Sequence, residues 1–429
     1  MTKILSAQVL DVRFPTSHHL DGSDAMYLDP DYSAAYLILQ TDHPDGLEGH
    51  SLVFTIGRGN DICVHAIKSY LSYVIGKDLE AFIDDMANFW RLICGDSQLR
   101  WLGPEKGIIY MAAGAIINAV WDLYAKLEKK PLWKLLADMT PQQLVACVDF
   151  TYIEDALKPE EAIELLQEKQ ASKNDRISLL EQQGYPAYTT SIGWMGYSDE
   201  KIIRLCRESM ANGWNAFKMK VGTDETDDMR RAGLLREMIG ESGLLMMDAN
   251  QVWGVEETIE RMEKFKKFQP FWIEEPTSPD DILGHAAIKK HVNPIKVATG
   301  EVCANRVIFK QFFQAKAIDI CQVDTVRMAG VNEVLAVLLL AHKFEVPVCP
   351  HAGGVGLCEL AQHIGMIDYI SISGTMENRM IEYVDHLHEH FIHPVKIVNG
   401  RYMPPTAAGY NIELKKSSLS NYLFNSENS

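Results

Sequence analysis

Short apolar runs that alternate with helical segments predict an α/β fold, a (β/α) barrel preceded by an α+β domain. From Tyr188 onward each run has the length of a strand, and an amphipathic segment separates it from the next. This alternation is typical of parallel βαβ units, and a region of roughly 200 residues suits a closed barrel better than an open sheet. The expected strands are 188–193, 215–221, 243–250, 270–276, 295–301, 318–324, 346–352 and 380–385.

The N-terminal third of the chain has a different pattern. Strand-like alternation covers 4–14 and 34–40, and a turn-rich loop joins the two segments. Helical periodicity then runs from 62 to 139. This order of elements predicts an α+β domain.

The change of pattern predicts two domains. The N-terminal α+β domain should span 1–140 and be completed by the C-terminal segment 390–429. The barrel should span 141–389. Between them, the charge-rich stretch 154–184 has a helical pattern. We expect it to be a solvated helical insertion.

Charge and composition exclude several classes of protein. The 429 residues include 41 basic and 58 acidic side chains, a formal net charge of −17. This charge repels phosphate backbones and anionic headgroups, so neither a nucleic acid nor a membrane is an expected partner. The uncharged stretch 107–121 is shorter than the about 20 residues of a membrane span and should form a buried helix. Because the eight cysteines include no CxxC pair, we expect reduced thiols and a cytoplasmic location.

Polar or ionisable residues close the expected strands from the second to the eighth. Successive members are separated by about one βα unit, so they should converge where the C-terminal ends of the strands form the mouth of the barrel. Any one of them alone is more commonly a helix cap or a surface charge. Their common register makes that explanation poor for the set, which is Lys218 with Lys220, Asp248 with Asn250, Glu274, Glu301, Asp324, His351 and Glu382.

Three acidic residues of this set follow three successive strands. Asp248, Glu274 and Glu301 would repel one another strongly unless a cation lay between them. Oxygen ligands without histidine or cysteine favour a hard cation, Mg²⁺ first. The sequence therefore predicts a Mg²⁺ site with positions left open for substrate oxygens.

Two further pairs supply acid and base groups. Lys218 and Lys220 point the same way because side chains alternate along a strand, and we expect each to depress the pKa of the other so that one can act as a base. A carboxylate at Asp324, one βα unit before His351, would fix the tautomer of the imidazole and support its protonated form. A metal flanked by a lysine and a histidine is suited to removing a proton next to a carboxylate.

With these residues assembled, the sequence resembles the enolase superfamily in its mandelate-racemase-like subgroup, and most closely the L-fuconate dehydratases. The likeness covers nearly the whole chain. It is carried by runs far more specific than a lone KxK pair, namely DGSDAMYLDPDYSAAY, LRWLGPEKG, YPAYTTS, FKMKVG, MDANQ, WIEEPTSPDDILGHA, ATGE, CPHAGGVGLCEL and EYVDHLHEHF. The resemblance implies that the α+β domain caps a (β/α)7β TIM-like barrel. It also implies dehydration of a sugar acid with Mg²⁺, converting L-fuconate to 2-dehydro-3-deoxy-L-fuconate and water.

The resemblance also implies a role for each matching residue. Lys220 is the implied base, His351 with Asp324 the opposed acid, and the implied metal ligands are Asp248, Glu274 and Glu301. Glu382 is expected to be protonated or bridged, because a free carboxylate there would repel the carboxylate of the substrate. The implied substrate contacts are Gly22, Ser23, Asp24, Tyr32, Lys218, Asn250 and Glu382. Apolar surface for the terminal methyl group of L-fuconate is expected from Met26, Tyr27 and Leu28.

Other functions share parts of this pattern. Dehydration of another aldonic acid, or racemisation, would begin with the same proton abstraction. A non-catalytic scaffold or regulatory protein is disfavoured because ligands, base and acid are all present. A metallohydrolase barrel usually has histidine among its metal ligands, and none stands at the three metal positions. The expected partners are a small-molecule sugar acid and further copies of the chain in a homo-oligomer.

Overall fold

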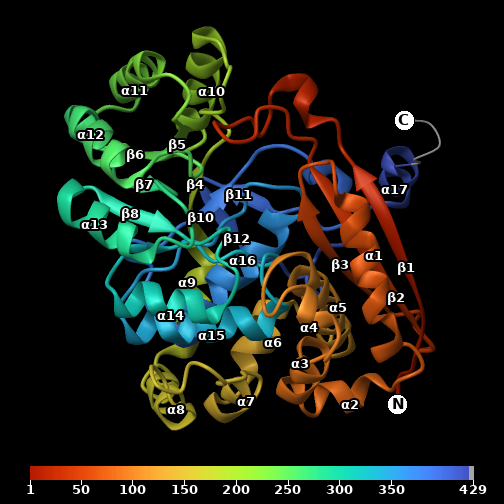
Figure 1. Ribbon diagram of the computed structural model, residues 1–429. Coiled ribbons are helices and arrows are strands. Elements are labelled where there is room, and N and C mark those ends of the chain that lie inside the picture. The colour runs from red at the N-terminus through yellow and green to blue at the C-terminus, as the bar shows by residue number, and fades with distance from the viewer. Residues whose placement is uncertain (425–429) are drawn as a thin grey trace.

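The computed structural model describes residues 1–424, in which an N-terminal cap packs against a barrel (Figure 1). In the cap, β1 (Ile4–Arg13), β2 (Ser33–Thr41) and β3 (Glu48–Thr55) form an antiparallel sheet in that order. The expected two-stranded hairpin was therefore incomplete, because β3 adds a third strand. Buried polar residues hid this strand in the sequence: His50 is buried, and its Nδ1 lies 2.8 Å from the hydroxyl of Tyr36.

The helices of the cap surround one long apolar helix, α5. This helix of 21 residues is long and apolar enough to cross a membrane, and its most apolar stretch has a mean hydropathy of 1.4. However, 83% of that stretch is buried inside the protein. It packs against β3, α1 and the barrel helix α15 (Gly330–Lys343), so it is the buried helix that the sequence predicts. The cap helices are α1 (Asn60–Tyr70), α2 (Leu79–Ile83), α3 (Met86–Cys94), α4 (Leu99–Leu102), α5 (Gly107–Leu127) and α6 (Leu132–Asp138).

The contact between α5 and the barrel is close and partly polar. A Cβ atom at Gly114 would lie 2.3 Å from the carbonyl oxygen of Met328, so only glycine fits there. The buried hydroxyl of Tyr110 donates to Glu333 of α15 at 2.7 Å. The buried barrel residue Arg306 lies 3.2 Å from this carboxylate and 3.2 Å from the carboxylate of Glu105 in the cap. These contacts fix the cap on the barrel.

Eight parallel segments form the barrel, and seven of the connections between them contain a helix, which confirms the predicted (β/α)7β class. After β9 the chain makes a single parallel bridge, Cys321 to Val348, where the seventh strand was expected. The last strand pairs with the first in parallel, Ile381 opposite Ala187, and closes the ring. The strands are β4 (Tyr185–Thr189), β5 (Ala216–Lys220), β6 (Leu244–Asp248), β7 (Trp272–Glu274), β8 (Lys296–Thr299), β9 (Ile320–Cys321) and β10 (Ile381–Tyr383).

Helices cover the outside of the barrel, and Figure 1 shows α11 to α13 on the side away from the cap. Besides α15, they are α10 (Asp199–Ala211), α11 (Glu225–Ile239), α12 (Val255–Phe265), α13 (Ile282–Val292), α14 (Arg306–Gln314) and α16 (Leu357–Ile367). Before the barrel lie α7 (Pro141–Ala146), α8 (Pro159–Gln167) and α9 (Lys173–Gln183).

The stretch 154–184 is helical, as expected, but it is not a solvated insertion. Leu166 of α8 and Leu180 of α9 are buried. The guanidinium of Arg176 donates to the carbonyl of Ile370 at 2.7 and 2.9 Å, which ties α9 to the end of the barrel. Charged residues on the outer faces of these helices concealed the buried positions.

The C-terminal segment contacts both parts of the protein. β11 (Lys396–Val398) and β12 (Arg401–Met403) form a hairpin, and β12 pairs with the barrel strand β4. α17 (Lys416–Tyr422) packs on β1 of the cap. The boundaries at 140 and 390 stay predictions, and the end of the expected cap segment, 425–429, lies outside the described residues.

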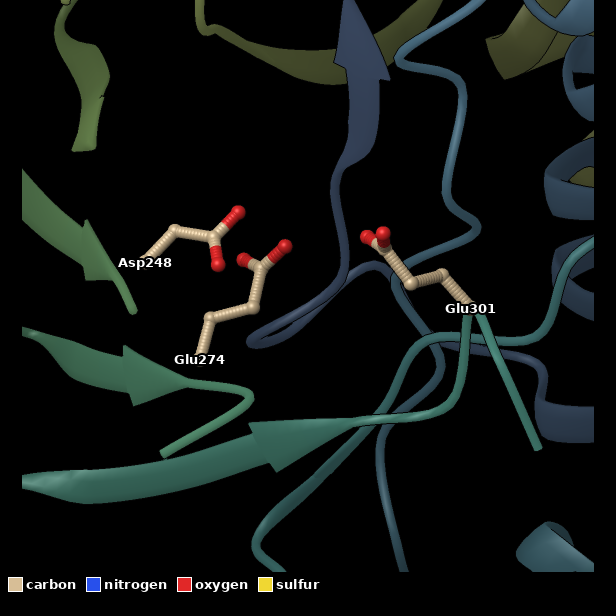
Figure 2. A group of neighbouring side chains, drawn as sticks. All are labelled: Asp248, Glu274 and Glu301. Carbon is tan, nitrogen blue, oxygen red and sulfur yellow. The ribbon is translucent and has the colours of Figure 1, made fainter. Parts of the chain in front are cut away.

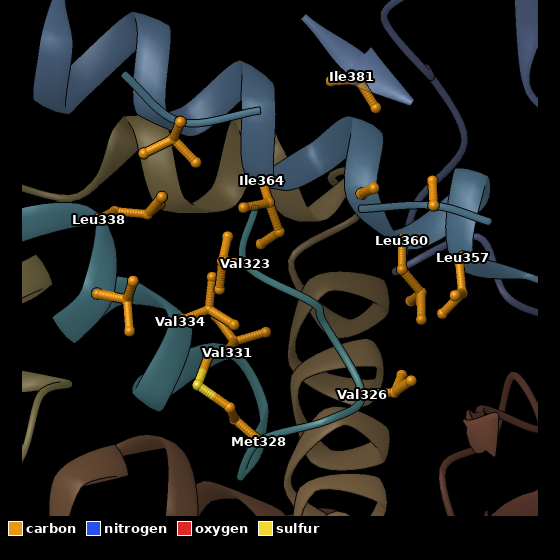
Figure 3. Packing of buried hydrophobic residues seen from close by; sticks show 14 of the residues in the cluster. Val323, Val326, Met328, Val331, Val334, Leu338, Leu357, Leu360, Ile364 and Ile381 are labelled. Atoms are coloured by element: carbon orange, nitrogen blue, oxygen red, sulfur yellow. The ribbon is translucent and has the colours of Figure 1, made fainter. Parts of the chain in front are cut away.

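The interior between α15, α16 and β10 is closely packed with aliphatic side chains (Figure 3). Val331, Val334 and Leu338 of α15 belong to the same buried cluster as Leu360 and Ile364 of α16. This packing supports the chain just after β9 and just before β10. All eight cysteines are buried and free, as the sequence predicts.

Candidate active site

The polar residues that close the strands gather at one mouth of the barrel. Parallel pairing places Lys220 opposite Asp248 and Asp248 opposite Glu274, so these three side chains are in register. Their strands are short and buried, and strand register therefore sets the position of each functional group. The predicted convergence of the set is what the structure has.

Three carboxylates form a compact group in this mouth. One oxygen from each of Asp248, Glu274 and Glu301 can be chosen so that all three lie within 4.8 Å of one another. Figure 2 shows the carboxylate of Glu301 facing the other two from the end of its own strand. Burial raises the pKa of Glu274 to about 8; Lys218 opposes this shift and Asp248 adds to it. Three oxygen donors in mutual repulsion, those of Asp248 and Glu274 buried and that of Glu301 partly buried, fit a small hard divalent cation.

Two lysines lie against this acidic group. The Lys218 Nζ atom is 2.5 Å from Glu274 Oε1, 3.2 Å from Asp248 Oδ2 and 2.8 Å from Glu382 Oε1. The Lys220 Nζ atom is 2.6 Å from Asp248 Oδ2 and 3.0 Å from Asn250 Oδ1. Lys218 is fully buried and does not line the cavity described below.

The pKa shifts of the lysines correct one expectation. Burial by itself would lower the pKa of Lys220, and Lys218 lowers it further, but the carboxylates of Asp248, Asp24 and Glu301 together raise it above its usual value. The pKa of Lys218 is raised well above its usual value for the same reason, chiefly by Glu274 and Glu382. The expected mutual depression is therefore present but smaller than the attraction of the carboxylates.

The predicted pair of Asp324 and His351 is present. His351 Nδ1 lies 2.7 Å from Asp324 Oδ2, while Nε2 lies 3.4 Å from Glu301 Oε2. Burial would lower the pKa of His351, but Glu301, Asp324 and Glu382 together raise it to about 9. The imidazole is thus held as a cation whose Nε2 faces the acidic group.

Glu382 is bridged and charged. Its Oε1 lies 2.8 Å from Lys218 Nζ and accepts a hydrogen bond from the hydroxyl of Thr190 at 2.5 Å. Its Oε2 accepts the backbone N–H of Ala352 at 3.1 Å. Burial opposes ionisation, yet Lys218 and His351 lower the pKa of Glu382 to about 2. Of the two expected states, bridged fits this arrangement and protonated does not.

A cavity of about 340 Å³ opens above these groups and reaches into the cap. Gly22, Asp24 and Tyr32 line it together with Lys220, Asn250, Glu301, His351 and Glu382. Gly22 has φ 88°, and a Cβ there would lie 2.5 Å from the Tyr32 hydroxyl oxygen, so this close approach requires glycine. Burial raises the pKa of Asp24 to about 6, while Lys220 lowers it.

Three cap-loop residues that the sequence predicts as substrate contacts have other surroundings. Among the described residues, Ser23 is not in the wall of the cavity, and its hydroxyl donates to the carbonyl of Leu28. Met26 and Leu28 lie outside this wall, with 44% and 59% of their surface exposed. Tyr27 does line the cavity, and further apolar wall comes from other cap residues, namely Phe54, Ile56, Cys63, Ile108 and Met111.

The sequence also gave no sign of two barrel residues in the wall. Trp194, from the loop after β4, covers Lys220, whose Nζ lies 5.3 Å from the ring centroid. Arg327 lines the cavity and donates to the carbonyl of Glu301 at 3.2 Å. Neither residue falls at the end of a strand, so the strand period does not single them out.

Two family models match the chain. The enolase C-terminal domain-like model covers residues 201–418, and the N-terminal domain model of mandelate racemase and muconate lactonizing enzyme covers 27–137. The chain belongs to the enolase superfamily. The capping part and the barrel of the enolase-superfamily fold thus each have a match.

Three proteins show what this enolase-superfamily chain is similar to. The crystal structure of human mitochondrial enolase superfamily member 1 has a TM-score of 0.97 and 54% identity, covering 98% of this chain and 96% of its own. An L-galactonate dehydratase from Hypocrea jecorina is 53% identical over 96% of this chain and 92% of its own. An L-talarate dehydratase from Polaromonas sp. JS666, crystallised with Mg and L-glucarate, is 21% identical with a TM-score of 0.72, covering 99% of this chain and 98% of its own; this likeness shows the fold alone. The expected specific likeness to L-fuconate dehydratases is thus replaced by a broader one, to the superfamily.

Proposed function

We propose that the protein dehydrates a sugar acid with Mg²⁺, and that L-fuconate is a substrate. The observation that carries this proposal is the placing of Lys220 and His351 at the two ends of one acidic group: Lys220 lies 2.6 Å from Asp248, and His351 lies 3.4 Å from Glu301. A base and an acid that flank a cation site can act on neighbouring carbons of one substrate. The dehydratase names of relatives support the reaction type.

The carboxylates Asp248, Glu274 and Glu301 would hold the cation. When bound, Mg²⁺ supplies positive charge beside the carboxylate of the substrate, where negative charge develops as the C2 proton leaves. The cation would also compete with Lys220 for Asp248, which would lower the pKa of the lysine toward that of a base.

Lys220 then takes the proton from C2. The electron pair of the broken C–H bond forms the C2–C3 double bond, the C3–O bond breaks, and His351 gives its proton to the departing hydroxyl, which leaves as water. His351 then takes up the O–H proton of the resulting enol and delivers a proton to C3, which yields the 2-oxo-3-deoxy acid. Asp324 does not touch the substrate in this scheme; it keeps His351 protonated and oriented.

Replacing Asp324 by asparagine should move the alkaline limb of the profile of kcat/KM against pH to lower pH. His351 acts as an acid only below its pKa of about 9, and removing the Asp324 charge takes away one of the groups that raise this pKa. Steady-state rates between about pH 6 and 10 measure the limb. The exposed Asp280→Asn serves as control, and an unchanged limb in Asp324→Asn would contradict the assigned role.

The substrate proposal is tested with L-fuconate and L-galactonate, which differ at C6 by a methyl or a hydroxymethyl group. The apolar wall of Phe54, Ile56 and Met111 should favour the methyl group by about 1 to 3 kcal/mol, so kcat/KM should be about 10-fold higher for L-fuconate. Formation of the 2-oxo acid product measures both rates. Should L-fuconate fall about 100-fold below L-galactonate, a difference of about 2.7 kcal/mol, L-fuconate is the wrong substrate and dehydration can still stand.

A further inference from the structure

Trp272 lies directly below the acidic group and touches one of its members. Strand β7 is only Trp272–Glu274, and the period of two along a strand turns the first and last of its side chains to the same side, into the barrel. Both are fully buried. The indole N–H of Trp272 donates to Glu274 Oε2 at 2.9 Å.

The indole is held firmly by its own neighbours. The ring of Tyr188 meets it edge to face, with 5.2 Å between ring centroids and an interplanar angle of 88°. Ala216, Met246 and Ala298 from the adjoining strands complete the same buried cluster. Close packing of this kind keeps a side chain in one rotamer, so the N–H has a fixed direction.

The two oxygens of Glu274 therefore differ. Oε2 is used by the indole, while Oε1 faces Lys218 Nζ at 2.5 Å on the side of Asp248. We infer that Trp272 is a positioning residue that fixes the Glu274 carboxylate so that a single oxygen, Oε1, is offered to the divalent cation. This inference rests on the proposed metal site.

Holding back one oxygen has a consequence for the choice of cation. Ca²⁺ takes six to eight oxygen ligands and often binds a carboxylate through both oxygens, whereas Mg²⁺ requires nearly octahedral geometry at shorter distances. A glutamate limited to one oxygen therefore favours Mg²⁺. Trp272 thus supports both the affinity for Mg²⁺ and the preference for Mg²⁺ over Ca²⁺.

The test compares cation binding by the wild type, Trp272→Phe and a matched control, Trp253→Phe. Phenylalanine keeps an aromatic ring at 272 but removes the N–H donor. The indole nitrogen of Trp253 is buried, has no hydrogen-bond partner within residues 1–424, and lies outside the cavity wall. Isothermal titration of chelator-treated enzyme with MgCl₂ and with CaCl₂ gives both Kd values for each protein.

For Trp272→Phe we expect the Kd for Mg²⁺ to rise about 10- to 100-fold, with a smaller change for Ca²⁺, because the loss of a hydrogen bond behind a metal ligand has effects of this size. The Mg²⁺ concentration for half-maximal rate should rise in parallel, and kcat at saturating Mg²⁺ should change much less. A role in packing alone would lower Tm and leave the Kd ratio unchanged, which would overturn the inference. Trp253→Phe should keep the wild-type ratio.

A second measurement uses the wild type and does not depend on folding of the variant. The eight tryptophans give indole ¹H–¹⁵N signals, and the spectrum of Trp272→Phe assigns the signal of Trp272. This signal should shift on addition of Mg²⁺, whereas that of Trp253 should not. If the wild type binds no Mg²⁺, the proposed function fails; if it binds Mg²⁺ while the signal and the Kd ratio stay unmoved, only the role of Trp272 fails.

Discussion

Lys220→Ala and His351→Asn are each expected to reduce kcat for dehydration by at least about 100-fold, because each removes a proton-transfer group from the transition state. The two groups serve different steps. His351→Asn leaves Lys220 in place, so this variant should still exchange the C2 hydrogen of the sugar acid with deuterated water, whereas Lys220→Ala should not. Product formation and loss of the C2 proton signal by NMR measure the two steps separately.

Lys290→Ala provides the control, since Lys290 is exposed on α13, away from the acidic group. Its rate should match that of the wild type. Near-normal turnover in both site variants would place the chemistry elsewhere. For substrates of the other C2 configuration, the assignment of base and acid should reverse, and exchange should then survive in Lys220→Ala.

Removal of the divalent cation should abolish turnover, and Mg²⁺ should restore it. The cation is expected to contribute several kcal/mol to the transition state, so Asp248→Asn should cost at least about 100-fold in kcat even at high Mg²⁺. Activity after chelation, after add-back, and in the variant measures the effect. The exposed Asp280→Asn should respond to chelator and add-back as the wild type does. Full activity of metal-free protein would end the proposal of a metal-dependent reaction.

The barrel could be predicted because strand-length apolar runs and helical segments alternate at a regular spacing in the sequence. The strands β5, β6 and β7 each end on a buried polar residue, and their parallel pairing turns this spacing into a shared position for Lys220, Asp248 and Glu274. Residues that act through strand register are visible in this way. The common position of the carboxylates and His351 could therefore be predicted without knowledge of distant contacts.

The rest of the site depends on tertiary contacts that no local pattern records. The apolar wall joins Phe54 of β3 to Met111 of α5, and β3 itself escaped notice because polar residues are buried within it. The rise in the lysine pKa values could not be predicted, because it depends on the distances to Asp248 and Glu274. The sequence does not distinguish Trp272 from an ordinary core residue, because its donor function depends on the rotamers of two side chains.

The close contact of α5 with the barrel limits how new substrate preferences can be introduced. Gly114 allows the backbone of the barrel to approach, and Tyr110 and Arg306 both serve the buried carboxylate of Glu333. A cap grafted from another protein would bring a different helix to this seam and remove the hydrogen bond from Tyr110, although Arg306 of the barrel helix α14 would stay on this carboxylate. Losing a hydrogen bond to a charged group costs about 1.5 to 3 kcal/mol. Specificity is therefore better transplanted one wall residue at a time, beginning with Met111, than by exchange of whole caps.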